Sequence, residues 1–134
     1  MPERQSAKSK KLTRRETRDL DVKITFMEGV VRRDSHYVEA LQILGDHYTQ
    51  RGRFDYSLKV DKQLSRLEPR NPLVYYNLAC SYCLLRKHEQ TLIELRRAFE
   101  LGYDDFTYLR RDRDLESIKN DRRFKTLVRE FAGL

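Results

Sequence analysis

The chain has 134 residues, of which 37% are charged and 39% are hydrophobic, and its formal net charge is +7. This length suits one domain with a shared core and excludes two independent domains. No stretch approaches the roughly 20 apolar residues of a membrane helix, and the N-terminus has no run of signal-peptide type. We therefore expect a cytoplasmic protein whose two cysteines stay reduced.

Residues 1–17 are predicted to form a disordered basic tail. Residues 1–19 carry seven basic and three acidic side chains, so this end of the chain holds +4 of the net charge. Leu12 is the single large aliphatic residue of the tail, which is too little apolar surface to offset the entropy of ordering. No aromatic residue is interleaved with the cations, which argues against recognition of single-stranded bases. The residues that could bind an anion are Lys8, Lys10, Lys11, Arg14, Arg15 and Arg18.

The first predicted helix covers residues 18–34. Leu20, Ile24, Met27 and Val31 recur at helical spacing and indicate one buried face. Ser35 is the expected N-cap of the next helix, because its hydroxyl can accept a hydrogen bond from an early backbone N–H.

Two helices are expected between residues 37 and 70. The first carries the stripe Leu41, Leu44 and Tyr48 and reaches about residue 51, where Gly52 suits a left-handed turn. Pro69 follows the second helix as a stop signal. The apolar positions of this second helix are Phe54, Leu58, Leu64 and Leu67.

A second pair of helices is expected between residues 71 and 104. Pro72 suits the first turn of the pair, and Gly102 closes it. The apolar positions are Tyr75, Leu78, Tyr82, Leu92, Leu95, Ala98 and Leu101. Residues 105–134 are expected to contain short helical turns at Phe106, Leu109, Leu115 and Ile118, and then a helix with Phe124, Leu127, Val128 and Phe131 on one face.

A spacing of 34 residues relates the two pairs of helices. Leu44 is matched by Leu78, Gly45 by Ala79, Tyr48 by Tyr82, Leu58 by Leu92, Leu64 by Ala98 and Leu67 by Leu101. A period of 34 with this Leu-small-Tyr pattern resembles the tetratricopeptide repeat family. The resemblance implies an all-α fold, a right-handed α-solenoid of antiparallel helix pairs. Its units would be a capping half-repeat helix (18–34), repeat 1 (37–70), repeat 2 (71–104) and a degenerate repeat or cap (105–134).

One position departs from the family pattern inside repeat 1. Asp61 stands where a large apolar side chain is usual, late in the second helix. An unpaired buried carboxylate is costly, so we expect Asp61 to lie at the edge or to be paired.

The resemblance also places one set of side chains in a concave groove. In repeat 1 these are Glu39, Gln42, Ile43, Asp46, Thr49 and Gln50, and in repeat 2 they are Leu73, Tyr76, Asn77, Cys80, Cys83 and Leu84. Such a groove is acidic at one end and apolar at the other, which suits a peptide with an apolar anchor. The implied function is a non-catalytic protein–protein interaction module, as an adaptor, co-chaperone or assembly factor.

Two alternatives stay open for the function. The first is an accessory factor for nucleic acid or ribonucleoprotein, recruited by the basic tail. The second is homodimerisation through the apolar end of the groove. The carboxylate clamp of some members of the family is not expected, because Asp46 would repel a carboxylate at one of its positions.

Catalytic, metal and cofactor sites are not expected. Cys80 and Cys83 form a C-x-x-C pair, but they lie in the middle of a predicted helix with no preceding strand, which disfavours a thioredoxin-type centre. Zinc needs about four ligands, and the histidines stand at unrelated spacings. The chain has no glycine-rich phosphate loop and no nucleophile elbow.

Overall fold

The computed structural model describes residues 11–133, and every regular element in that range is helical. The all-α class is therefore confirmed, and residues 11–133 contain no β-strand. None of the helices in this range has the length and hydrophobicity needed to cross a membrane. The elements are α1 (Arg14–Arg33), α2 (Val38–Arg51), α3 (Phe54–Leu67), α4 (Pro72–Leu84), α5 (His88–Glu100), α6 (Phe106–Arg111), the 3₁₀ helix η1 (Arg113–Ile118) and α7 (Arg122–Ala132).

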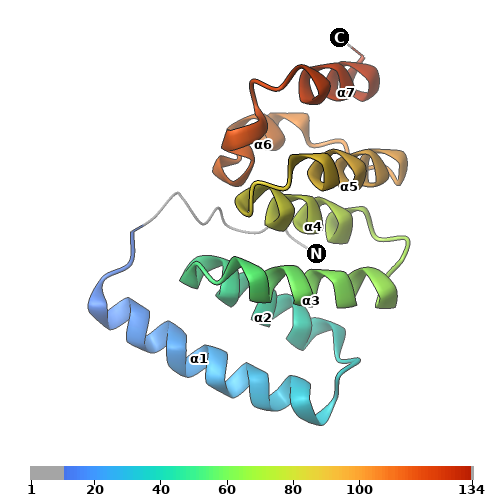
Figure 1. The fold of residues 1–134 in the computed structure, drawn as a ribbon. Helices are drawn as coiled ribbons and strands as arrows, with labels where there is room; N and C mark the ends of the chain where they lie inside the picture. Colours follow the sequence, from blue (N-terminus) through green and yellow to red (C-terminus); the bar gives the residue numbers. More distant parts are fainter. Residues whose placement is uncertain (1–10, 134) are drawn as a thin grey trace.

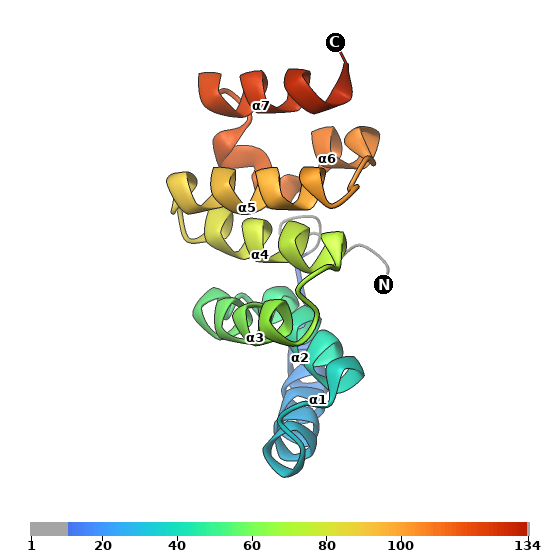
Figure 2. The ribbon, with the colours of Figure 1, turned by 90° about the vertical axis from the view of Figure 1, so that its right-hand side faces the viewer.

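The helices are stacked in chain order, from α1 at one end to α7 at the other (Figure 1). α1 packs on α2, α2 on α3, α3 on α4, and α4 on α5, while α5 also contacts α7. The direction of the helices changes along the stack, and α1 is steeply inclined to α4 and α5 (Figure 2). Each helix thus buries its apolar face mainly against elements that adjoin it in the sequence, as expected for a stack of repeated units.

α1 begins earlier than the sequence pattern predicts. Thr13 is its N-cap, with its side-chain oxygen accepting a hydrogen bond from the Glu16 N–H at 3.1 Å. The Glu16 carboxylate in turn accepts from the Thr13 N–H at 3.1 Å, which completes a capping box. The predicted tail boundary at residue 17 is therefore wrong, because the cap lies seven residues before Leu20, where the apolar period starts. The predicted disorder of residues 1–10 lies outside the described residues.

Three turns between helices use a left-handed backbone, at Gly52, Arg86 and Gly102. Gly52 has φ 81°, as the sequence predicts, and Arg86, 34 residues later, has φ 61°. A side chain is strained in this region, so the second turn is less favourable than the first. Pro72 opens α4 as predicted. The N-cap of α2 is Tyr37, without a side-chain hydrogen bond, so the prediction of Ser35 as the cap is wrong.

The buried residues include carboxylates beside the predicted apolar stripes, and one of them, Asp61, belongs to the region predicted as repeat 1. Asp61 is 0% exposed, and its Oδ2 accepts a hydrogen bond from the Ser81 hydroxyl on α4. Ser81 also lies 3.3 Å from the hydroxyl of Ser57, so a polar network joins α3 to α4. The expectation that Asp61 is paired is confirmed. Leu101 is 39% exposed and does not face the core, because α5 ends at Glu100 and the chain turns there.

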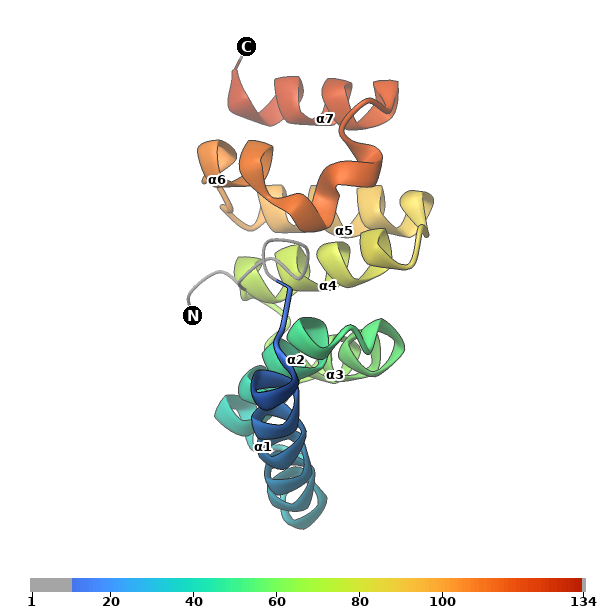
Figure 3. The ribbon, with the colours of Figure 1, turned by 90° about the vertical axis from the view of Figure 1, so that its left-hand side faces the viewer.

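The C-terminal unit is broken in its first helix. α6 ends at Arg111, and Asp112 then serves as the N-cap of η1 by accepting a hydrogen bond from the Asp114 N–H at 3.0 Å. η1 turns back onto α4, against which it packs, and α7 follows above α6 (Figure 3). Leu109, Leu115 and Ile118 are each 0% exposed, so this unit completes the core at that end of the stack.

Candidate functional site

The half of the predicted groove that belongs to repeat 2 is covered by the chain itself. Tyr76, Cys80 and Cys83 are each 1% exposed and Asn77 is 3% exposed, because η1 packs against this face of α4. Leu73 and Leu84 are half-buried. The prediction that these side chains line an open groove is therefore wrong for the four buried residues. The sequence could not show the break at Asp112 that folds η1 over them.

A polar network fixes η1 on α4. The Tyr76 hydroxyl donates a hydrogen bond of 2.6 Å to Oδ2 of Asp112, and the Cys80 thiol lies 3.7 Å from the same oxygen. The Tyr76 ring is stacked on Tyr103 with centroids 4.4 Å apart. Burial raises the pKa of the Tyr76 phenol far above its usual range, so the hydroxyl keeps its proton and acts as the donor. Asp112 is 3% exposed, so its carboxylate depends on these donors.

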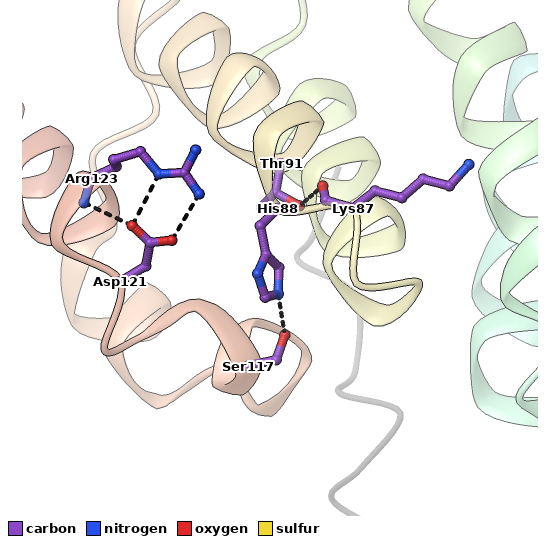
Figure 4. Close-up of polar contacts among 6 residues, drawn as sticks. All are labelled: Lys87, His88, Thr91, Ser117, Asp121 and Arg123. Carbon is purple, nitrogen blue, oxygen red and sulfur yellow. Dashed lines mark hydrogen bonds and ion pairs between the residues drawn. The ribbon is translucent and has the colours of Figure 1, made fainter.

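A second contact holds the other end of η1, at Ser117 (Figure 4). The Ser117 hydroxyl lies 3.0 Å from Nε2 of His88 on α5 and 3.3 Å from Sγ of Cys83 on α4. The N-cap of α7 is Asp121, which accepts hydrogen bonds from the backbone N–H and the guanidinium of Arg123. These bonds to Arg123 lower the pKa of Asp121 to about 2. The covering segment is thus anchored at both ends, through Asp112 and through Ser117, while Asp121 and Arg123 form a local cap of α7.

The two cysteines are free thiols, as the sequence predicts, but both are buried beneath η1. Burial and the neighbouring hydroxyl and carboxylate groups leave no access for a substrate disulfide. Among residues 11–133, no group of three His, Cys, Asp or Glu side chains is placed to hold a metal ion.

The half of the predicted groove that belongs to repeat 1 is only partly accessible. Glu39 and Ile43 on α2 are exposed, and the exposed fraction of Ile43 is 44%. Gln42, Asp46 and Gln50 are half-buried. Thr49 is 0% exposed, and its hydroxyl donates to the Gly45 carbonyl at 3.0 Å, so its prediction as a groove residue is wrong.

α1 presents an apolar face in addition to the predicted core stripe. Val22 and Phe26 are both 69% exposed. They are four residues apart, so they lie side by side on the helix, roughly opposite the buried Leu20 and Ile24. The sequence signal for this exposed apolar face was the i, i+4 spacing of Val22 and Phe26 on the side opposite the core stripe. A helix with one buried stripe normally has polar residues on that side.

The candidate anion-binding residues fall in three places. Lys8 and Lys10 lie outside the described residues. Lys11 is exposed just before the N-cap of α1. Arg14, Arg15 and Arg18 lie on α1 itself, where the helix dipole disfavours cations in the first turn. Arg14 and Arg15 therefore belong to a helix, in contrast to the disordered tail predicted for residues 1–17, whereas Arg18 lies within the predicted first helix.

Comparison with known proteins yields a distant relative. The chain is 27% identical over 107 residues to a chloroplastic protein of Arabidopsis thaliana. The match includes 78% of this chain and 30% of the relative, so the chain spans less than a third of that protein. No protein-family model matches the chain.

Proposed function

We propose that this protein is a non-catalytic protein–protein interaction module of the tetratricopeptide type. The 34-residue spacing, the stacked helices and the left-handed turns at Gly52 and Arg86 support the assignment to that type. The single observation that carries an interaction function is the exposure of Val22 and Phe26 on α1, at 69% each. Large apolar side chains paired on an ordered helix mark interaction surfaces in soluble proteins.

The charges around this pair define the partner. Arg15 and Arg33 lie within about 20° of Val22 around the helix, Arg18 within about 40° and Asp19 within about 60°, so three cations and one acid flank the pair. The apolar centre of α1 therefore has cations at both ends. A second copy of α1 would place arginine against arginine in either orientation, which disfavours a homodimer through this face. We infer that the partner is an amphipathic segment with an apolar centre and acidic residues on both sides.

Photocrosslinking tests this proposal at the residue that carries it. The full chain with a benzophenone amino acid at Phe26 is irradiated in native lysate, and the crosslinked segment is sequenced by mass spectrometry. We expect one dominant protein partner, crosslinked through a segment with acidic flanks. The same probe at Ile93, which is 51% exposed on α5, is the matched control. A probe at Ile43 on α2 tests whether the open part of the predicted groove contributes.

Two results would contradict the proposal. The first is an equal set of products from positions 26 and 93, because it would mean that the α1 face has no preferred partner. The second is a dominant crosslink to another copy of the same chain, which would assign this face to self-association.

A nucleic-acid accessory role is the second candidate. The observation that favours it is the clustering of Lys11, Arg14, Arg15 and Arg18 at the positive end of the α1 dipole, where an anion would offset their mutual repulsion. Replacing these four residues with glutamine keeps the Thr13 cap and tests this role. RNA binding that is unchanged by this replacement would exclude the role.

The cytoplasm is our proposed location, and imaging of a fluorescent fusion distinguishes it from the chloroplast, where the name of the relative places that protein.

A further inference from the structure

A cavity of about 300 Å³ lies at the C-terminal end of the stack, between α6, the end of η1 and α7. Its floor is apolar and consists of Leu109, Phe124 and Val128. α6 and α7 face each other at this end of the molecule (Figure 3). The cavity is separate from the exposed pair Val22 and Phe26, because α1 lies at the opposite end of the stack from α6 and α7 (Figure 1).

Four cations surround this apolar floor, namely Arg110, Lys119, Lys125 and Arg129. None of the seven residues that line the cavity is acidic. Lys125 and Arg129 are four residues apart on α7, a spacing at which like charges destabilise a helix by about 0.2–0.5 kcal/mol. None of the four forms an ion pair with a side chain of residues 11–133. The cations therefore repel one another without an internal counter-charge.

Nearby carboxylates are directed elsewhere. Asp121 pairs with Arg123 on its own helix turn, and Glu130 pairs with Arg96 of α5 at 2.8 Å. Asp112 and Asp114 are buried, at 3% and 2% exposure. These four acids are therefore held away from the cavity, and Glu116, which is exposed on η1, does not line it.

We infer that this cavity binds an acidic peptide segment that carries an apolar side chain. The four cations attract the carboxylates of the segment and lose their mutual repulsion when it binds. The floor of Leu109, Phe124 and Val128 takes the apolar side chain, and a volume of about 300 Å³ accommodates one such anchor with its flanking backbone. This site goes beyond the interaction surface proposed on α1, because the two surfaces lie at opposite ends of the stack.

The shape of the cavity favours a peptide over nucleic acid. Single-stranded nucleic acid binds to exposed aromatic rings on which its bases stack. The one aromatic residue of the cavity, Phe124, is 5% exposed and offers only part of its ring. A free phosphate would use the cations but would leave the apolar floor unoccupied.

The test is a titration of the ¹⁵N-labelled full chain, followed by NMR, with two hexapeptides of equal charge. The probe peptide is acetyl-Asp-Glu-Leu-Phe-Glu-Asp-amide, and the control peptide has two serines in place of Leu-Phe. We expect the probe to shift the amide signals of Phe124, Val128 and Lys119, and to bind at least about tenfold more tightly than the control. The affinity for the probe falls as salt rises, because the cations contribute.

Matched variants locate the charge contribution. Lys125→Ala with Arg129→Ala removes two cations of the cavity, and affinity for the probe should fall about tenfold. Arg113→Ala with Arg122→Ala removes two cations that do not line the cavity, and affinity should change less than about threefold. Val128→Thr keeps the shape of the side chain but adds a hydroxyl, and it should weaken the probe without affecting the control peptide.

Three results would overturn the inference. Equal affinity of the two peptides would mean that the apolar floor takes no part. Saturation by inorganic phosphate or by a 15-nucleotide oligouridine at the same amides, with no effect of the probe, would make the cavity a phosphate or RNA site. Absence of shifts at millimolar probe would mean that the cavity does not bind an acidic peptide, and this result depends on no variant.

Discussion

The hydrogen bond between Tyr76 and Asp112 is the point at which the covering segment can be released. Tyr76→Phe removes the hydroxyl and leaves the ring, so the stack with Tyr103 at 4.4 Å is retained. The carboxylate oxygen that accepted the bond at 2.6 Å is left with the Cys80 thiol at 3.7 Å as a weak donor. Asp112 stays buried, at 3% exposure, and loses its strongest partner.

The expected cost follows from the burial of both groups. A hydrogen bond to a charged acceptor contributes about 1.5–3 kcal/mol, and an unsatisfied buried acceptor loses its hydration as well. We expect Tyr76→Phe to lower the free energy of unfolding by about 2 kcal/mol. The cysteines lie under η1, so they are exposed when η1 opens locally. A decrease of about 2 kcal/mol in the free energy of this opening raises its equilibrium constant about 30-fold.

Two assays measure the two quantities. Urea unfolding followed by circular dichroism gives the loss of stability. The rate at which Cys80 and Cys83 react with Ellman's reagent in native buffer reports the opening of η1. Tyr82→Phe is the matched control, because Tyr82 lies on the same helix, is half-buried, and its hydroxyl makes no hydrogen bond to residues 11–133.

The double-mutant cycle with Asp112→Asn decides whether the pair itself is responsible. A coupling energy of at least about 1 kcal/mol between the two positions is expected. If Tyr76→Phe behaves like Tyr82→Phe in both assays, or if the cycle shows no coupling, then the bond does not hold η1 on α4 and the proposed covering is not stabilised in this way.

Further predictions concern the turns, the half-buried His47 and the C-terminal segment. Arg86→Gly should raise the melting temperature, because glycine adopts φ 61° without strain, whereas Gly52→Ala should cost about 1 kcal/mol in urea unfolding. An opposite sign at either turn would contradict the backbone argument. Burial lowers the pKa of His47, so the unfolded chain binds the proton more readily and stability should decrease as pH falls below about 6.5. His47→Gln should reduce this slope in urea unfolding measured between pH 7.5 and 5.5, and an unchanged slope would exclude His47 as its origin. Deletion of residues 104–134 should abolish cooperative unfolding, because it removes the buried Leu115 and its neighbours from α4; a cooperative melt near the temperature of the full chain would refute this.

The local sequence determined the positions and the types of most elements. The stripes at Leu20 and Ile24, at Leu41 and Leu44, and at Leu95 are buried as predicted, because a 3.6-residue period leaves one face apolar wherever the helix packs. Gly52 and Pro72 mark a turn and a helix start for reasons that act within a few residues. The start of α1 was missed because the cap at Thr13 lies before the first apolar residue of the stripe, in a segment dominated by charge.

The tertiary structure decided which of these surfaces are accessible. Tyr76 and Cys80 were predicted to line an open groove, but the break at Asp112 lets η1 fold over them. The burial of Tyr76 and Cys80 depends on contacts with Asp112, which is more than 30 residues away in the sequence. The periodicity of apolar residues within one helix does not predict such contacts. The same holds for charge: composition counts Asp112 as an acid at the C-terminal end, whereas folding directs it inward to Tyr76. The sequence by itself thus determined the helices, and the folding of the last unit onto α4 determined the surfaces that remain for a partner.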